Sequence, residues 1–192
     1  LRYRIPVTFV TLLCAGVAIA GVPPFSGFHS KDAILLAAHA RHPWMFWVGV
    51  VTAGMTAFYV FRAIFMCFFG SYRGKAHPHE SPLVMTLPLG VLAPLSLGGG
   101  YFNVPSYLAP LFGEPHADHD ATLVAISVGA GLAGIFLAYL FYVVKPDLPG
   151  SLAHAFSGPY KLIYNKYFVD EAYDALVVHP IRDGSRAVLW QG

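Results

Sequence analysis

A lysine and an aspartate stand next to each other inside a long apolar stretch that runs from about residue 6 to about residue 40. Ionisable side chains at membrane depth are costly, and where they occur they most often transfer ions or protons. Lys31 and Asp32 follow the run Gly21-Val22-Pro23-Pro24, which interrupts a helix. Interrupted helices are tolerated in a membrane only where protein or a hydrated cavity surrounds them. The pattern therefore predicts a proton-transfer site at Lys31 and Asp32.

The expected position of Lys31 favours the loss and uptake of a proton. Ser30 is a suitable N-cap for a second half-helix that starts near Lys31, which would place the ammonium in the first turn, at the positive end of that helix dipole. Removal from water also disfavours the charged form, whereas a nearby carboxylate would favour it. Asp32 lies about 100° around the helix from Lys31, so it need not be the ion-pair partner. The alternative is that both are ordinary residues that extend to the surface from a helix end.

Histidines raise the question of a metal site. The clusters His77-Pro-His79-Glu80 and His116-Ala-Asp118-His119-Asp120 hold suitable ligand types, but neither has the paired spacing of a structural zinc site. We expect them on opposite sides of the membrane, so we interpret them as solvated loop residues and predict no metal site. His29, beside the interruption, has two open interpretations: a member of a hydrogen-bonded proton path, or a local structural role.

The composition is typical of an integral membrane protein. Of the 192 residues, 56% are hydrophobic and only 11% are Asp, Glu, Lys or Arg, whereas soluble domains carry roughly 25% charged residues. A net charge of +2 is too small to indicate nucleic-acid binding. No phosphate loop, nucleotide fingerprint, cysteine cluster or catalytic triad occurs, so we expect no cofactor in this chain. We interpret Cys14 and Cys67 as small buried apolar side chains.

Four apolar segments reach the roughly 20 residues that a membrane crossing requires. The sequence thus predicts an all-α membrane protein whose bundle occupies residues 1–148, with spans at about 6–40 (broken), 44–69, 82–103 and 121–144. Small residues at four-residue spacing in the last span permit close contact between helices. They form two rows, Ala125 with Gly129 and Ala133, and Ala130 with Gly134.

The distribution of positive charge predicts the orientation of the bundle. With four crossings, nine Lys and Arg residues share the side that holds the N-terminus, the 70–81 loop and everything after residue 145, and Arg41 alone lies opposite. Cytoplasmic loops carry an excess of Lys and Arg, so we expect both ends on the cytoplasmic side. Residues 149–192 mix tyrosines with charges and are too polar to span. They predict an interfacial segment that leads into an amphipathic lateral helix, with a plain connecting loop as the alternative. The nine residues are Arg2, Arg4, Arg73, Lys75, Lys145, Lys161, Lys166, Arg182 and Arg186.

Several runs resemble the antiporter-like membrane subunits of respiratory complex I, NADH:quinone oxidoreductase. Residues 20–35, Ala-Gly-Val-Pro-Pro-Phe-Ser-Gly-Phe-His-Ser-Lys-Asp-Ala-Ile-Leu, resemble the broken helix of that family. Thr56-Ala57-Phe58-Tyr59 with Arg62 is similar to its next helix, and Pro78-His79-Glu80-Ser81-Pro82 to the loop after it. Residues 164–174 are similar to the lead-in to the long lateral helix of the largest such subunit, the subunit L type.

The resemblance implies a proton-translocating subunit of a bacterial inner membrane, of which this chain is the C-terminal third. It implies that Lys31 is the broken-helix lysine on the exit side of the second half-channel, with Asp32 beside it. Partners would be the other membrane-arm subunits and the lipid bilayer, whereas NADH, FMN, iron–sulfur clusters and quinone would belong to partner subunits. Two alternatives stay open: a Mrp-type cation/proton antiporter or membrane-bound hydrogenase subunit, and a structural segment that conducts nothing.

Overall fold

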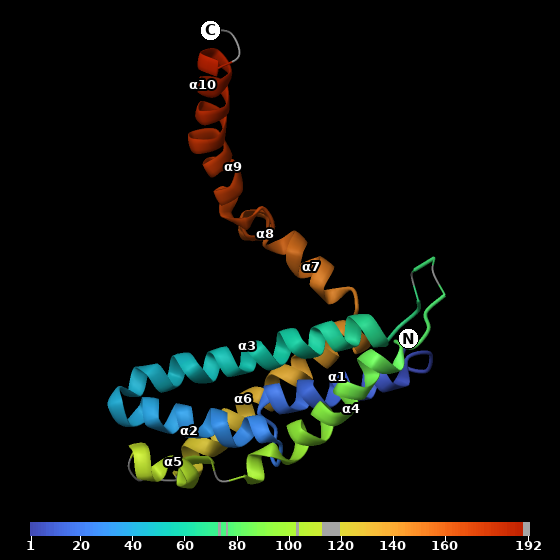
Figure 1. Cartoon of the computed structure of the whole chain (residues 1–192), viewed down its shortest axis with the longest axis vertical. Coiled ribbons are helices and arrows are strands. Elements are labelled where there is room, and N and C mark those ends of the chain that lie inside the picture. Colours follow the sequence, from blue (N-terminus) through green and yellow to red (C-terminus); the bar gives the residue numbers. More distant parts are fainter. Residues whose placement is uncertain (73, 76, 103, 113–119, 190–192) are drawn as a thin grey trace. The chain divides into compact units, whose positions relative to one another are not determined.

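The computed structural model describes a helical chain, as the composition predicts (Figure 1). Every element of regular structure among the described residues is a helix, so the all-α prediction is confirmed. The chain forms two compact units, residues 1–146 and residues 147–192. The structure describes residues 1–72, 74–75, 77–102, 104–112 and 120–189.

Two helices occupy the first apolar stretch. α1 spans Pro6–Ala20 and α2 spans Ser26–Arg41. Gly21 ends α1 in the left-handed conformation, with φ of 76°, which a residue without a Cβ adopts at little cost. Pro23 and Pro24 follow, and neither can donate a helical hydrogen bond. The glycine and the prolines together set the end of α1 and the start of α2.

α2 starts earlier than its capping residues suggest. The sequence predicts Ser30 as the N-cap, but the helix begins at Ser26 and Ser30 lies in its second turn, where its hydroxyl donates to the carbonyl of Gly27 over 3.4 Å. The prediction for Ser30 is wrong because the helix can form as soon as the last proline has passed. Lys31 consequently stands in the second turn of α2 rather than in the first.

α3 (Pro43–Phe68) and α6 (Ala121–Tyr139) pack closely against each other in the 1–146 unit. A π-helical turn, η2 (Leu140–Val144), continues α6. A Cβ added to Gly134 on α6 would collide with the carbonyl oxygen of Gly54 on α3, so the two backbones touch at this point. The buried core around this contact consists of Ala20, Ala57, Phe61, Phe65 and Ala138.

Only one of the two predicted rows of small residues lies in this contact. It is the row of Ala130 and Gly134, both of which approach Gly54. The other row is exposed, because residues 129 and 130 stand about 100° apart around the helix. Four-residue spacing permits a close contact but does not select the row that makes it. The exposed residues are Ala125, Gly129 and Ala133.

α1 and α2 each pack against α3 and follow one another along it (Figure 1). α4 (Leu83–Gly98) packs along α1 and continues into a 3₁₀ turn, η1 (Gly99–Tyr101), which α5 (Val104–Phe112) follows. Among the described residues, three helical segments are long and apolar enough to cross a membrane, whereas α1 is apolar but shorter. The chain is therefore a membrane protein. The three segments are Pro43–Phe68, Leu83–Tyr101 and Ala121–Val144.

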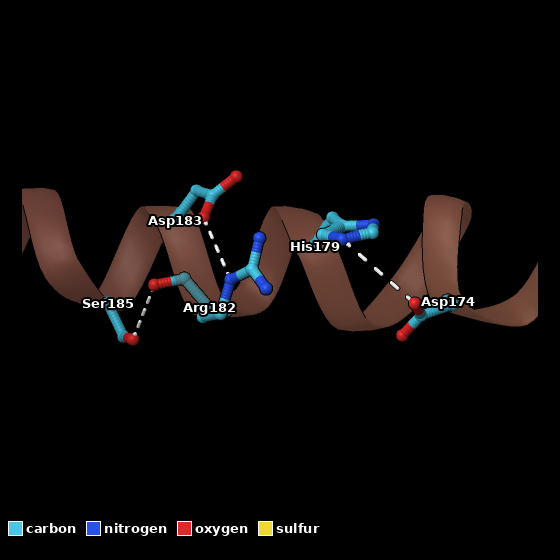
Figure 2. Close-up of polar contacts among 5 residues, drawn as sticks. All are labelled: Asp174, His179, Arg182, Asp183 and Ser185. Carbon is cyan, nitrogen blue, oxygen red and sulfur yellow. Dashed lines mark hydrogen bonds and ion pairs between the residues drawn. The ribbon is translucent and has the colours of Figure 1, made fainter.

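The 147–192 unit is a succession of short helices. They are α7 (Leu148–Ala155), α8 (Ser157–Tyr164), η3 (Lys166–Phe168), α9 (Val169–Tyr173), η4 (Asp174–Val178) and α10 (His179–Leu189). Figure 2 shows local polar contacts along the last two: His179 Nε2 lies 4.0 Å from Asp174 Oδ2, and Arg182 Nε lies 3.1 Å from Asp183 Oδ1. Asp174 and His179 meet although they are five residues apart, because η4 is π-helical. Such exposed pairs contribute little to stability.

Candidate functional site

The side chain of Lys31 lies against the end of α1. Its Nζ donates hydrogen bonds to the carbonyl oxygens of Ile19, over 3.1 Å, and of Ala20, over 3.4 Å. The last four carbonyls of a helix have no partner within the helix and carry the negative end of its dipole. Lys31 therefore caps α1 from the following helix, and the carbonyls of α1 provide acceptors for the ammonium.

This electrostatic setting differs from the predicted one. The sequence predicts Lys31 at the positive end of α2, whereas its ammonium meets the negative end of α1, because α2 begins at Ser26. The α1 carbonyls interact favourably with the positive charge. Gly21 permits the approach, since a Cβ at that position would lie 3.1 Å from Cδ of Lys31.

Asp32 faces a different neighbour. Its side chain is buried, and its Oδ1 accepts a hydrogen bond from the hydroxyl of Ser127 on α6 over 2.6 Å. Lys31 and Asp32 are adjacent in the chain, yet one contacts the end of α1 and the other contacts α6. All the ion pairs found among the described residues lie in the 147–192 unit. Lys31 and Asp32, which belong to the 1–146 unit, are therefore not paired with each other in the described part of the chain.

A cleft of about 530 Å³ opens beside Lys31. At roughly 30 Å³ for each water molecule, it has room for several. Its lining is mostly apolar but includes the hydroxyl-bearing residues Ser26, Ser30 and Ser96. The hydroxyl of Ser26 donates to the carbonyl of Ser96 over 2.7 Å, which joins the start of α2 to α4. Lys31 thus lines a space that can hold water, in a mostly apolar bundle.

Comparison with known proteins identifies the family. Residues 1–56, which include Lys31 and Asp32, match the family described as NADH:quinone oxidoreductase/Mrp antiporter, transmembrane. The chain is 36% identical to the NAD(P)H-quinone oxidoreductase chain 5 of Picosynechococcus sp., over 98% of this chain and 34% of that protein. The NADH-quinone oxidoreductase subunit L of Rhodobacter capsulatus is 32% identical, over 100% of this chain and 39% of that protein. The chain belongs to this family of antiporter-like membrane subunits.

These matches confirm the family that the sequence motifs indicate, the antiporter-like membrane subunits of complex I. A further relative, the NADH-quinone oxidoreductase subunit L of Mycobacterium tuberculosis, is 40% identical over 76% of this chain and 25% of that protein. The chain thus spans between about a quarter and two fifths of the length of these relatives, as the covered shares of 34%, 39% and 25% indicate.

His29, the third predicted site residue of this antiporter-like chain, turns toward η1. Its ring centroid lies 5.9 Å from that of Tyr101 and 5.3 Å from that of Phe28. A Cβ added to Gly100 would collide with the His29 ring. The ring therefore packs against η1, whereas the ammonium of Lys31 contacts α1. A packing contact is the observed role of His29, and its membership in a proton path stays a prediction.

The structure describes the first of the two histidine-containing loop clusters more fully than the second. In the first, His77 and His79 are exposed. In the second, residues 116–119 lie outside the described residues, and Asp120 caps α6 by accepting from the amide of Thr122 over 2.8 Å. That bond holds the pKa of the Asp120 carboxyl below its usual value. Among the described residues, no three His, Cys, Asp or Glu side chains are grouped so that they could hold a metal ion.

Glu80 is not a solvated loop residue, and that interpretation is wrong for it. Its carboxylate accepts from the amide of Val7 over 2.9 Å and from the hydroxyl of Thr8 over 2.5 Å. The bond from the Thr8 hydroxyl, with those from the backbone amides, holds the pKa of Glu80 below its usual value. Glu80 therefore caps the N-terminus of α1 from the loop that precedes α4.

Sequence reasoning missed Ser127 and Glu80. A single serine in an apolar helix has no pattern of its own, and its partner Asp32 lies 95 residues away. A buried carboxylate does require a hydrogen-bond donor, so an unpartnered Asp32 was the available signal that a polar side chain of another span must meet it.

Proposed function

We propose that this chain forms the C-terminal part of the antiporter-like subunit of a proton-translocating NADH:quinone oxidoreductase in a bacterial inner membrane. In this proposal, α1 and α2 together form one broken span, and α3, α4 and α6 form three more. The excess of Lys and Arg at one side supports a cytoplasmic location for both ends of the chain. The partners are the other membrane-arm subunits, and NADH, FMN, iron–sulfur clusters and quinone are held by partner subunits.

The position of Lys31 at the interruption carries this proposal. An ammonium at membrane depth is retained only where polar groups or water compensate for lost hydration. The carbonyls of Ile19 and Ala20 supply the polar groups, and the cleft lined by Lys31 supplies room for water. The cleft gives the proton of Lys31 a route, and the two carbonyl oxygens accept hydrogen bonds from its ammonium. Lys31 exchanges a proton with the cleft, on the exit side of the path.

The mixture of exposed tyrosines and charged side chains in the C-terminal unit supports the interfacial part of the proposal. Tyrosines such as Tyr160, Tyr164 and Tyr173 are exposed in this unit, among charged side chains. Tyrosine is favoured at the membrane–water interface, because its ring is apolar and its hydroxyl remains hydrated. We propose that residues 149–192 lie along the cytoplasmic face and lead into a lateral helix.

The decisive experiment replaces Lys31 in the full-length subunit within the assembled complex. Lys31→Met removes the titratable amine and keeps most of the side-chain length, so the number of protons translocated for each NADH oxidised should fall. Lys161→Met, at an exposed lysine of the C-terminal unit, is the matched control and should leave that number unchanged. An unchanged number in Lys31→Met would establish the structural alternative, in which this segment conducts nothing.

The family match also includes Mrp antiporters. Proton movement in inside-out vesicles distinguishes a Mrp antiporter from an NADH-driven complex. A sodium gradient that drives proton movement without NADH would assign the chain to a cation/proton antiporter instead.

A further inference from the structure

Asp32 and Ser127 form an isolated polar pair in the contact between α2 and α6. Both side chains are almost fully enclosed, with 9% of Asp32 and 6% of Ser127 exposed. Apolar residues of the same two helices and of α3 surround this contact. Within the described part of the chain, no cation lies within ion-pair distance of Asp32. The hydroxyl of Ser127 is therefore the side-chain partner of a buried carboxyl group.

The geometry around Ser127 offers its hydroxyl two acceptors. Its Oγ lies 2.6 Å from Oδ1 of Asp32 and 3.0 Å from the carbonyl oxygen of Val124, one turn earlier on α6. A distance of about 2.5–2.7 Å is usual for a hydroxyl that donates to a carboxylate. A serine hydroxyl has one hydrogen to donate and two lone pairs that accept. It can donate to only one of the two acceptors at a time.

These properties match the two states of a carboxyl group that gains and loses a proton. When Asp32 is ionised, Ser127 donates to Oδ1. When a proton binds Oδ1, the new Asp32 hydroxyl donates to Oγ of Ser127, and the Ser127 hydrogen turns to the carbonyl of Val124. The proton leaves the O–H bond of a hydronium ion in the path and forms the O–H bond on Asp32, and no other covalent bond changes. In both states Oδ1 of Asp32 and the hydroxyl of Ser127 keep a hydrogen-bond partner, and the loss of that partner in a buried site would cost stability.

We infer that Ser127 is a positioning residue of the proton path, which satisfies Asp32 in both its charged and its neutral state. This inference rests on the proposed proton translocation and extends it from α2 to α6. Lys31 and Asp32 then serve two sides of one helix. Lys31 exchanges a proton with water in the cleft beside α1 and α4, and Asp32 gains and loses a proton while it stays hydrogen-bonded to Ser127 on α6.

The test uses the full-length subunit in the assembled complex and counts the protons translocated for each NADH oxidised. Ser127→Ala should lower this number, and Ser127→Thr, which keeps the hydroxyl, should restore it. Ser151→Ala is the matched control, because the Ser151 hydroxyl donates only to the carbonyl of Asp147, one turn earlier in an exposed helix. It should leave the number unchanged.

A double variant separates a role through Asp32 from a general packing role. If Ser127 acts on Asp32, Ser127→Ala should cause no further loss once Asp32→Asn is present, because coupled residues are not additive. A full proton count in Ser127→Ala, or losses that add in the double variant, would overturn the inference. If Ser127→Ala fails to assemble, recovery of assembly with Asp32→Asn supports the inference, and continued failure overturns it.

The outcome with Lys31→Met distinguishes this inference from the proposed function. A lowered proton count in Lys31→Met with a full count in Ser127→Ala overturns the role of Ser127 alone. Full counts in both variants overturn proton translocation through this segment, and the role of Ser127 with it.

Discussion

Glu80 and Thr8 join two segments of the bundle that are 72 residues apart in the sequence, through a hydrogen bond of 2.5 Å from the Thr8 hydroxyl to Oε1 of Glu80. The amides of Val7 and Thr8 also donate to this carboxylate. Because the first four amides of a helix have no acceptor within the helix, Glu80 satisfies a requirement that the first turn of α1 cannot meet by itself. The loop before α4 is thereby fixed to the start of α1, the helix whose last carbonyls accept hydrogen bonds from Lys31.

Removing the Glu80 carboxylate should loosen the start of α1. In the full-length subunit with Glu80→Ala, we expect faster hydrogen–deuterium exchange at the amides of Val7 and Thr8, because they lose their acceptor. Glu171→Ala, at an exposed carboxylate of the C-terminal unit, is the control and should leave exchange in α1 unchanged. Equal exchange in the wild type and in Glu80→Ala would contradict the capping role.

The same cap should weaken in acid. A carboxyl whose pKa is lower in the folded state stabilises that state above its usual pKa, and this contribution is lost as the pH falls through the folded value. Glutamate has a usual pKa of about 4.3, and the bond from Thr8 lowers that of Glu80. The difference in thermal stability between the wild type and Glu80→Gln should therefore be constant near neutral pH. It should shrink once the pH falls below the usual pKa of glutamate. A stability difference that grows in acid would contradict a lowered pKa of Glu80 in the folded state.

The sequence predicted the helical class, the apolar segments and the importance of residues 21–32, because helix breakers and buried charges have strong local signals. It misplaced the start of α2, since Ser30 is a good capping residue but Pro24 already permits a helix from Ser26. That shift of one turn changed the electrostatics of Lys31. The contacts of Asp32 with Ser127 and of Thr8 with Glu80 depend on which helix faces which, and no local pattern encodes that choice.

Gly27 provides a test of the contact between the two helices of the first apolar stretch. A Cβ at this position would collide with the carbonyl oxygen of Ala18, so α2 must move away from α1. Gly27→Ala should cost about 1–3 kcal/mol, as is usual for overpacking, and lower the thermal unfolding temperature of the full-length subunit. Gly129→Ala is the control, because a Cβ there meets nothing within 4 Å. It should be neutral or slightly stabilising, and an equal loss in both variants would contradict the close contact.

The proposal that α1 and α2 form one broken span predicts that the start of α1 and the end of α2 lie on opposite sides of the membrane. In a subunit without its native cysteines, Tyr3→Cys and His42→Cys should react with a membrane-impermeant maleimide from opposite faces of sealed vesicles. Both residues are exposed, so burial does not prevent labelling. Ser151→Cys should label from the same face as Tyr3→Cys. Labelling of positions 3 and 42 from one face would show that the broken span does not cross.

Gly21 gives a test of the Lys31 site that leaves every charge in place. Its φ of 76° disfavours any other residue, and a Cβ there would lie 3.1 Å from Cδ of Lys31. Gly21→Ala should therefore displace the ammonium from the carbonyls of Ile19 and Ala20 and lower the number of protons translocated for each NADH oxidised. Gly70→Ala is the matched control, because Gly70 has a φ of 84° but a Cβ there meets nothing within 4 Å.

Both substitutions carry the same left-handed backbone penalty, roughly 1–2 kcal/mol, so a general loss of stability should affect them alike. A fall in proton translocation that is confined to Gly21→Ala, with equal amounts of assembled complex, would assign the effect to the position of the Lys31 ammonium. Equal falls in the two variants would assign it to backbone strain instead, and the contact between Lys31 and the end of α1 would then have no part in translocation.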